Sequence, residues 1–154
     1  MTAGQTLTTE SVHAAAALYV LSVAAWLEQR DRVSRITWSL ACAFYLVHVA
    51  AAFQFYHHWS HTAAYIATER ISGWGASLYI NYLFIAIWIS DIIFWWRARA
   101  VRVAIHVFFA FMFFNAAVVF GAGPIRWFGA AATVLLIALY IIRTRIAPDR
   151  LPLA

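Results

Sequence analysis

The sequence predicts an all-α integral membrane protein, a single bundle of five transmembrane helices that covers residues 1–154. Composition is the first observation: 65% of the residues are hydrophobic and only 11% are charged, whereas a soluble domain is about 45 to 50% apolar and about 25% charged. The second is a mean hydropathy of +0.76. Because so few polar side chains could cover a water-facing surface, a soluble globular domain and intrinsic disorder are excluded. The single cysteine, Cys42, excludes an internal disulfide scaffold.

Five apolar runs are the third observation. A helix that crosses about 30 Å of hydrocarbon needs ~20 residues, with a range of about 17 to 25. The runs cover residues 12–27, 36–57, 74–96, 103–120 and 127–142. We expect Thr8, Thr9 or Ser11 to cap the first helix, with Glu10 near its positive end. The break from Gly121 to Pro124 also allows a re-entrant last pair, but five crossings fit the lengths better.

The second connection, residues 59–73, is the only long one. Its segment AAYIATERIS either continues the second helix above the lipid or lies on the surface as a short amphipathic helix. No Lys or Arg precedes the first apolar run, so we expect no signal peptide.

The arginines predict the orientation. Nine of the eleven cationic residues fall in the first connection, the third connection and the C-terminal segment, and only Arg70 and Arg126 fall elsewhere. Because cytoplasmic segments carry the excess of Lys and Arg, we expect the C-terminus inside and the N-terminus outside a bacterial inner membrane. This distribution also accounts for the formal charge of +5, so the expected partner is the lipid bilayer and not nucleic acid.

A histidine cluster at the outer end of the second helix is the first candidate site. In the segment Tyr-His-His-Trp-Ser-His, His57 and His61 lie one turn apart if the helix continues, and two imidazoles at that spacing can chelate one ion. His58 is the third expected ligand, and His13 and Glu69 are auxiliary groups. Neutral imidazoles suit copper, zinc or iron. The alternative is that these side chains only anchor a helix end at the interface.

A second set of polar residues lies deeper. From the outer helix ends, His48 is ~13 Å deep, Asn81 ~10 Å, Asn115 ~9 Å and Thr133 ~9 Å. Polar groups in hydrocarbon must face the bundle interior and find partners, which predicts a buried pocket lined by His48, Asn81 and Asn115, with Trp88 on the same inward face. The alternative is that the Asn and Thr side chains hold helices together, at ~0.6 kcal/mol each.

One face of the third helix carries a stripe that should look into the bundle. Its members recur at spacings of three and four: Ser77, Asn81, Phe84, Trp88, Asp91 and Trp95. Asp91 and His106 lie at similar distances from the inner side, which allows a pair that is either a proton relay element or a structural contact. His48 and His106 differ in depth by ~12 Å, which argues against a mid-membrane bis-histidine haem within the chain.

The segments HVAAAFQFYHHWSH and NYLFIAIWISDIIFWW, within residues 48–96, resemble a group of small uncharacterised bacterial membrane proteins with a similar Trp-Ser-His segment and later Asn-Tyr, Trp and Asp residues. The resemblance covers about a third of the chain. It marks these residues as candidates for a functional role, but it implies no activity, cofactor or partner.

The leading functional hypothesis is therefore a transition-metal site at the periplasmic mouth of the bundle, in a redox, hydrolytic or purely structural role. A first alternative is an electron-transfer protein with b-type haem, either held near the outer face by His13 and one of His57, His58 or His61 or shared between subunits. A second is a structural subunit without a cofactor. The alanine-rich segments 14–17 and 50–52 permit close helix approach and so are compatible with a homo-oligomer.

Overall fold

The computed structural model describes residues 2–94 and 98–146. Of these described residues 89% are helical and none lies in a strand, as the sequence predicts. The elements in chain order are α1 (Ala3–Leu27), α2 (Asp31–Ala52), the π-helical turn η1 (Phe53–His57), α3 (His61–Ser72), α4 (Ser77–Phe94), α5 (Arg99–Phe114), the π-helical turn η2 (Asn115–Val119) and α6 (Pro124–Ile146). Trp95, Trp96, Arg97 and Arg150 lie outside the described residues.

Five of these helices are long and apolar enough to cross a membrane, which confirms the predicted number of candidate spans. They cover Ala3–Leu27, Asp31–His57, Ser77–Phe94, Ala100–Val119 and Pro124–Ile146. Many large apolar side chains on them point outward: Val134 is 68% exposed, Ile146 75% and Trp127 76%. Such a surface is unfavourable in water and suits a lipid environment.

The first helix begins earlier than the sequence analysis predicts. Thr2, and not Thr8, Thr9 or Ser11, is the N-cap: its side-chain oxygen accepts a hydrogen bond from the Gln5 backbone N–H, and the Thr2 backbone N–H donates to Gln5 Oε1. This reciprocal pair is a capping box. The hydroxyls of Thr8 and Ser11 instead donate to carbonyls one turn back inside the helix. The polar start of the chain is thus already helical.

The first two helices form a closely packed antiparallel hairpin. Small buried residues recur at spacings of three, four or seven along α1: Gly4, Thr8, Ser11, Ala15, Ser22 and Ala25. Ser22 is fully buried, and its hydroxyl lies 2.9 Å from the Ser34 carbonyl of α2. At Gly4 a Cβ would lie 2.5 Å from the Phe55 ring, so only glycine allows that ring to rest on α1. The small residues therefore let the two backbones approach.

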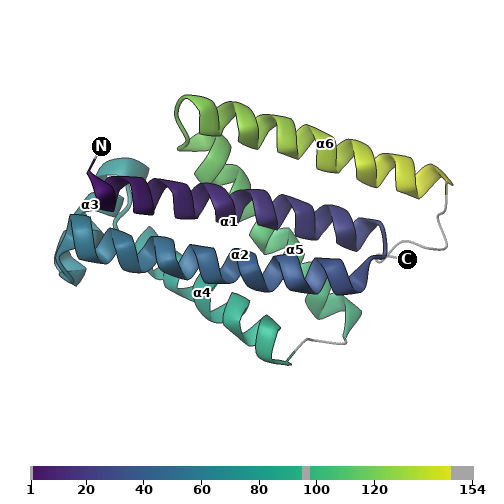
Figure 1. The fold of residues 1–154 in the computed structure, drawn as a ribbon, viewed down its shortest axis with the longest axis horizontal. Coiled ribbons are helices and arrows are strands. Elements are labelled where there is room, and N and C mark those ends of the chain that lie inside the picture. The colour runs from purple at the N-terminus through teal and green to yellow at the C-terminus, as the bar shows by residue number, and fades with distance from the viewer. Residues whose placement is uncertain (1, 95–97, 147–154) are drawn as a thin grey trace.

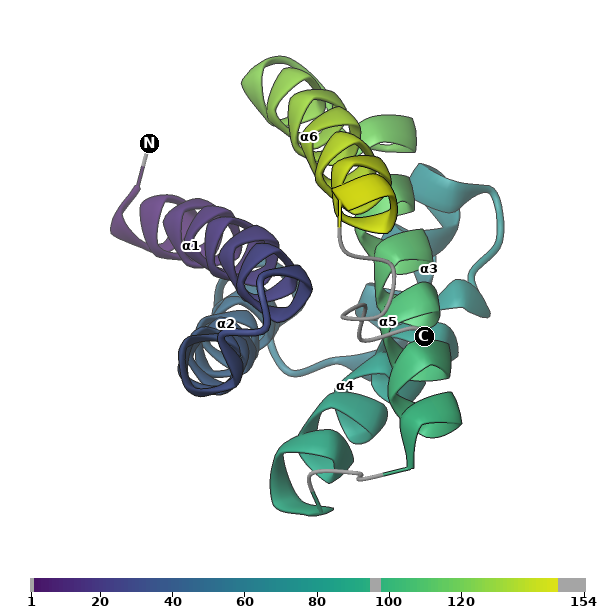
Figure 2. The ribbon, with the colours of Figure 1, turned by 90° about the vertical axis from the view of Figure 1, so that its right-hand side faces the viewer.

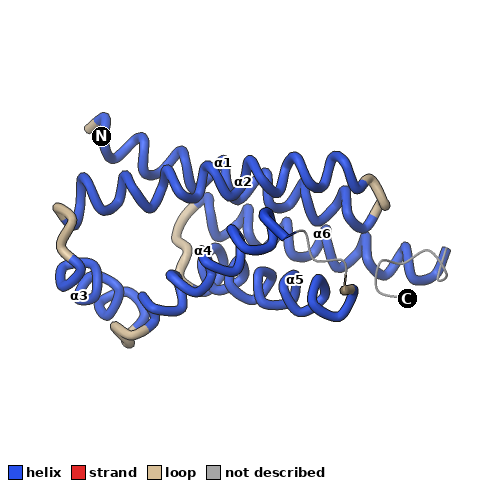
Figure 3. The backbone as a smooth tube through the Cα atoms, turned by 90° about the horizontal axis from the view of Figure 1, so that it is seen from below, coloured by secondary structure: helices blue, strands red, loops and turns tan. Residues whose placement is uncertain are grey.

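The remaining helices complete an open bundle around this hairpin. Seen end-on, α1 and α2 lie on one side, α5 lies opposite, and α6 and α4 close the two remaining sides (Figure 2). The N-terminus and the described end of α6 lie at opposite ends of the long axis (Figure 1), as expected for an odd number of long helices along this axis. Helix α3 is a separate short helix joined to α2 and α4 by loops at the N-terminal end (Figures 1 and 3).

Aromatic side chains fill the centre of the bundle. Trp38, Trp88 and Phe109 are at most 2% exposed. Trp38 lies 5.2 Å from Trp88 and 4.8 Å from Phe109 between ring centroids, so α2, α4 and α5 meet at this point. Offset and edge-to-face contacts of this kind add to the packing of the core.

An ion pair ties α6 to the end of α1. The Arg143 guanidinium donates two hydrogen bonds to the carboxylate of Glu28, the one from Nε at 2.8 Å. Because both side chains are about one-third exposed, we expect Glu28→Gln to lower the free energy of unfolding by only about 0.2–1 kcal/mol. Denaturant titration in detergent measures this loss. Glu10→Gln, at an exposed position, is the control, and an equal loss in both variants would contradict a specific role for the pair.

Candidate functional site

A cavity of about 290 Å³ lies between the α1–α2 hairpin and helices α4, α5 and α6. Its walls are mostly apolar and aromatic. The lining residues are Val12, His13, Ala16, Tyr19, Tyr45, Asn81, Phe84, Trp88, Phe109, Met112, Phe113, Ala116, Ala117 and Ile125. In size and character this resembles small-molecule pockets, which are concave, largely apolar and furnished with a few convergent polar groups.

The π-helical turn η2 shapes one wall of this cavity. The Phe120 backbone N–H donates to the Asn115 carbonyl at 2.9 Å, five residues back, which inserts one extra residue into the helical turn. Ala116 and Ala117 of this turn line the cavity. At Gly129 of α6 a Cβ would lie 2.6 Å from that of Ala117, so glycine permits α6 to seat directly on the turn. Turns of this type occur often at functional sites.

Ring contacts set the aromatic walls. Phe84 lies 5.1 Å from Trp88 in an edge-to-face arrangement and 4.3 Å from Phe109. Tyr45 lies 5.7 Å from Trp88 across α2 and α4. These rings hold one another in place, because each is packed against at least one other ring. The cavity therefore has rigid aromatic surfaces against which a flat molecule could stack.

Polar groups interrupt this apolar lining. Among the described residues, no side-chain hydrogen bond involves Tyr19, Tyr45 or Asn81. Trp88 Nε1 is buried and also lacks a hydrogen-bond partner there. An amide offers both donors and an acceptor, a tyrosine hydroxyl one of each kind, and an indole N–H one donor. A bound molecule with oxygen atoms could satisfy the tyrosine hydroxyls and the Asn81 amide, whereas Trp88 Nε1 has almost no accessible surface.

The predicted pocket residues separate into two sets. Asn81 and Trp88 line the cavity. His48 lies elsewhere: its Nδ1 is 2.8 Å from the Thr8 carbonyl, so the ring joins α2 to α1. The Asn115 side chain donates to the Phe111 carbonyl one turn back, at 2.8 Å. Thr133 likewise bonds the Gly129 carbonyl of its own helix. For these three residues the geometry favours a structural role.

The histidine cluster does not share one helix face, and the premise of a continuous helix is wrong. The helix ends at His57, and His58 and Trp59 have positive φ angles of 48° and 56°. A new helix, α3, starts at His61. Positive φ lies outside the right-handed helical region, so the helix cannot continue through these two residues. Of the two structures predicted for the second connection, the separate helix is the one observed.

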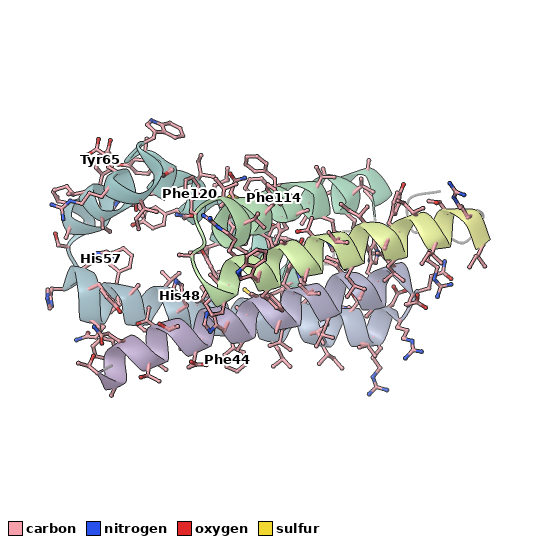
Figure 4. All side chains as sticks on the ribbon, turned by 90° about the horizontal axis from the view of Figure 1, so that it is seen from above. Phe44, His48, His57, Tyr65, Phe114 and Phe120 are labelled. Atoms are coloured by element: carbon pink, nitrogen blue, oxygen red, sulfur yellow. The ribbon has the colours of Figure 1, made fainter. Side chains whose placement is uncertain are left out.

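The rings of the cluster contact different aromatic residues. His57 lies 5.6 Å from Phe53 of its own helical segment, whereas His61 lies 5.8 Å from Tyr79 and 5.7 Å from Tyr82 of α4. His13 lines the cavity and Glu69 is exposed on α3. His57 and His48 are well separated along the same helical segment (Figure 4).

Residues 2–94 and 98–146 contain no group of three or more His, Cys, Asp or Glu side chains that could hold an ion. Metal binding by His57, His58 and His61 therefore stays a prediction from the sequence. Metal analysis of the untagged protein and of a variant with alanine at these three positions tests it. If the three histidines share an ion, the metal content of the unmodified protein must be higher than that of the variant. A haem held by His13 and another histidine also stays a prediction, and the cavity itself presents His13 alone as a histidine ligand.

Sequence reasoning missed Tyr19, Tyr45 and the cavity face of α5. A signal was present for the tyrosines, because each places a hydroxyl well inside an apolar run, away from the interfacial positions that tyrosine favours. Phe109, Met112 and Phe113 gave no such signal in a segment where most residues are apolar. Only the packing of α5 shows which of these side chains face inward.

No family model, curated protein or solved structure matches the chain. The resemblance of residues 48–96 to small bacterial membrane proteins therefore stays a prediction.

Proposed function

We propose that this chain is a multi-pass inner-membrane protein whose bundle binds a flat, lipid-soluble molecule with one or more carbonyl or hydroxyl oxygens, such as a quinone. The observation that carries the proposal is the cavity of about 290 Å³, walled by aromatic rings and furnished with unpaired polar groups. A largely apolar pocket with a few convergent polar groups is the usual place of ligand binding.

The volume of the cavity limits the size of its ligand. An apolar cavity of about 150 Å³ in another protein holds one benzene ring. The present cavity is about twice that volume, at about 290 Å³. We therefore expect a ligand body of about two fused six-membered rings, with any longer tail extending out of the bundle. His13 and Ala116 are exposed lining residues, so the cavity opens to the surface beside them.

The chemistry of the lining selects an uncharged ligand. No Asp, Glu or Arg lines the cavity within the described residues, so neither a strong cation nor a strong anion finds a counter-charge there. Flat faces of Phe84, Trp88 and Phe109 favour stacking with an aromatic or quinoid ring. The Asn81 amide can donate to a carbonyl oxygen, which distinguishes an oxygenated ring from a plain hydrocarbon of the same size.

Two bicyclic probes of equal size test this proposal. Isothermal titration in detergent micelles should show tighter binding of 1,4-naphthoquinone than of naphthalene to the unmodified protein. In Asn81→Leu we expect this preference to fall by about tenfold, the equivalent of one hydrogen bond of ~1.4 kcal/mol, while naphthalene binds as before. Equal affinities in the unmodified protein would contradict recognition of the oxygens, and binding of neither probe would refute the ligand site.

For orientation, we propose the N-terminus and α3 outside and the end of α6 inside. The arginine distribution supports this, and both helix α3 and the N-terminus lie at the same end of the bundle (Figure 1). In a Cys42→Ala background, a membrane-impermeant maleimide applied to spheroplasts should label Ala122→Cys, in the loop before α6, but not Gln29→Cys, in the turn after α1. Both positions are exposed in the bundle. The reverse pattern would invert the orientation.

A further inference from the structure

A second, much smaller cavity lies towards the other end of the bundle. Its volume is about 10 Å³, and its walls come from α2, α4 and α5. The lining residues are Ser34, Trp38, Asp91, Arg102, Ile105 and His106. Five of these six residues carry a polar or charged group, in contrast to the aromatic lining of the large cavity. Asp91 and His106, which the sequence allows as a pair, thus line the same space.

Two buried polar atoms around this cavity lack a protein partner. Trp38 Nε1 and His106 Nδ1 both have almost no solvent-accessible surface and form no hydrogen bond of normal geometry to a described residue, although the Trp38 indole lies close enough to Asp91 to act on its carboxyl group. Trp38 is 2% exposed and Asp91 7%. An unsatisfied buried donor costs about 1–3 kcal/mol, so such groups normally have a partner in a native protein. A small molecule with hydrogen-bonding atoms would supply the missing partners.

Aromatic rings enclose this polar site. The His106 ring stacks on Trp26 of α1 at 4.2 Å and meets the Trp38 ring at 5.1 Å. Trp26 is 6% exposed, so it covers the imidazole from the side of α1. Because these rings hold the imidazole in one orientation, His106 cannot readily turn to find another partner. Arg102 and Arg35 are the cationic groups that act on Asp91 from α5 and α2.

We propose that this cavity is a binding site for one water molecule that bridges Trp38 Nε1, the Asp91 carboxyl group and His106 Nδ1. A water needs about 10–15 Å³ and two to four polar partners, and the cavity offers both. The indole N–H is only a donor and the carboxylate oxygen accepts, so the bridging molecule must accept and donate. Water does both, whereas an anion would be repelled by Asp91 and a metal ion would gain nothing from the indole N–H.

This water would join three helices at one point. Trp38 comes from α2, Asp91 from α4 and His106 from α5, so the bridge connects the α1–α2 hairpin to the other half of the bundle. Asp91 and His106 are then a water-bridged pair and not a direct ion pair. The water site does not depend on the ligand in the large cavity.

Water-to-indole cross-relaxation in the full-length protein tests this site. With ¹⁵N-labelled tryptophan in micelles, the Trp38 Hε1 proton should show a cross-peak to water in both nuclear and rotating-frame Overhauser spectra. Opposite signs in the two frames identify a bound water, because proton exchange gives the same sign in both. The Trp38→Phe spectrum assigns the peak, and Trp59, whose Nε1 donates to Gln54 at an exposed position, serves as a reference for bulk solvent.

Variants then identify what holds the water. We expect Asp91→Leu to abolish the Trp38 cross-peak, and His48→Phe, at a partly buried histidine outside this cavity, to retain it. Absence of the cross-peak in the unmodified protein would overturn the proposal, whether or not the variants fold. Its persistence in a folded Asp91→Leu protein would show that the carboxyl group is not a partner and would overturn the bridge as proposed.

Discussion

Replacing Ala16 by phenylalanine should lower the affinity for 1,4-naphthoquinone by at least about tenfold while the bundle stays folded. Ala16 lies on α1 and its side chain faces the cavity of about 290 Å³. A benzyl group there occupies the space that one ring of the ligand needs, and each factor of ten in affinity corresponds to about 1.4 kcal/mol. Because the added ring enters a cavity and not a filled core, the overpacking cost of about 1–3 kcal/mol should be largely avoided.

The neighbouring position supplies a matched control for this variant. Ala17 is exposed and does not line the cavity, so Ala17→Phe adds the same ring on another face of the same helix. Titration calorimetry of both variants in the same detergent also corrects for partition of the probe into micelles. Equal affinities of Ala16→Phe and the unmodified protein would show that the probe binds outside the cavity. Equal losses in both variants would point to an indirect effect on α1.

Trp38→Ala should be the most destabilising single truncation in the core. The side chain is 2% exposed and contacts rings from three other helices, among them Tyr19 at 6.1 Å, Phe109 at 4.8 Å and Trp88 at 5.2 Å. Truncating a fully buried tryptophan removes this burial and leaves a cavity, at a cost of about 3–5 kcal/mol. The helices that meet at Trp38 would lose their common contact.

Unfolding by denaturant in mixed micelles measures this loss. Trp127→Ala is the control, since Trp127 is 76% exposed and we expect a change within about 0.5 kcal/mol. Trp38→Phe retains an aromatic ring and should lie between the two. A loss at Trp38 no larger than that at Trp127 would contradict the central position of the indole.

Much of the fold followed from composition and run length. The apolar runs at residues 12–27, 36–57, 74–96, 103–120 and 127–142 each contain most of one observed helix. This worked because a bilayer demands helices of a defined length whose residues are nearly all apolar. The start of α1 was misplaced because Thr2 and Gln5 form a capping box within a polar segment that no hydropathy pattern marks.

The candidate site was predicted less completely. Asn81 and Trp88 could be found, because polar and indole groups inside an apolar helix rarely face lipid. His48 obeys the same rule, yet its partner is the Thr8 carbonyl of α1, and a backbone atom leaves no mark in the sequence. The predicted one-turn spacing of His57 and His61 required a continuous helix. The helix is interrupted at His58 and Trp59, whose positive φ angles depend on how α2 is joined to α3.

The sequence by itself determined that this protein is all-helical, that five helices are long and apolar enough to span a membrane, and which of their residues are polar. Only the tertiary structure decided which of these polar residues meet. Helix rotation and tilt depend on packing between small residues such as Ser22 and Gly4 and large rings such as Phe55 and Trp38. In segments that are apolar on every side, hydrophobic periodicity is too weak to specify that rotation, so the cavity and its lining emerge from packing alone.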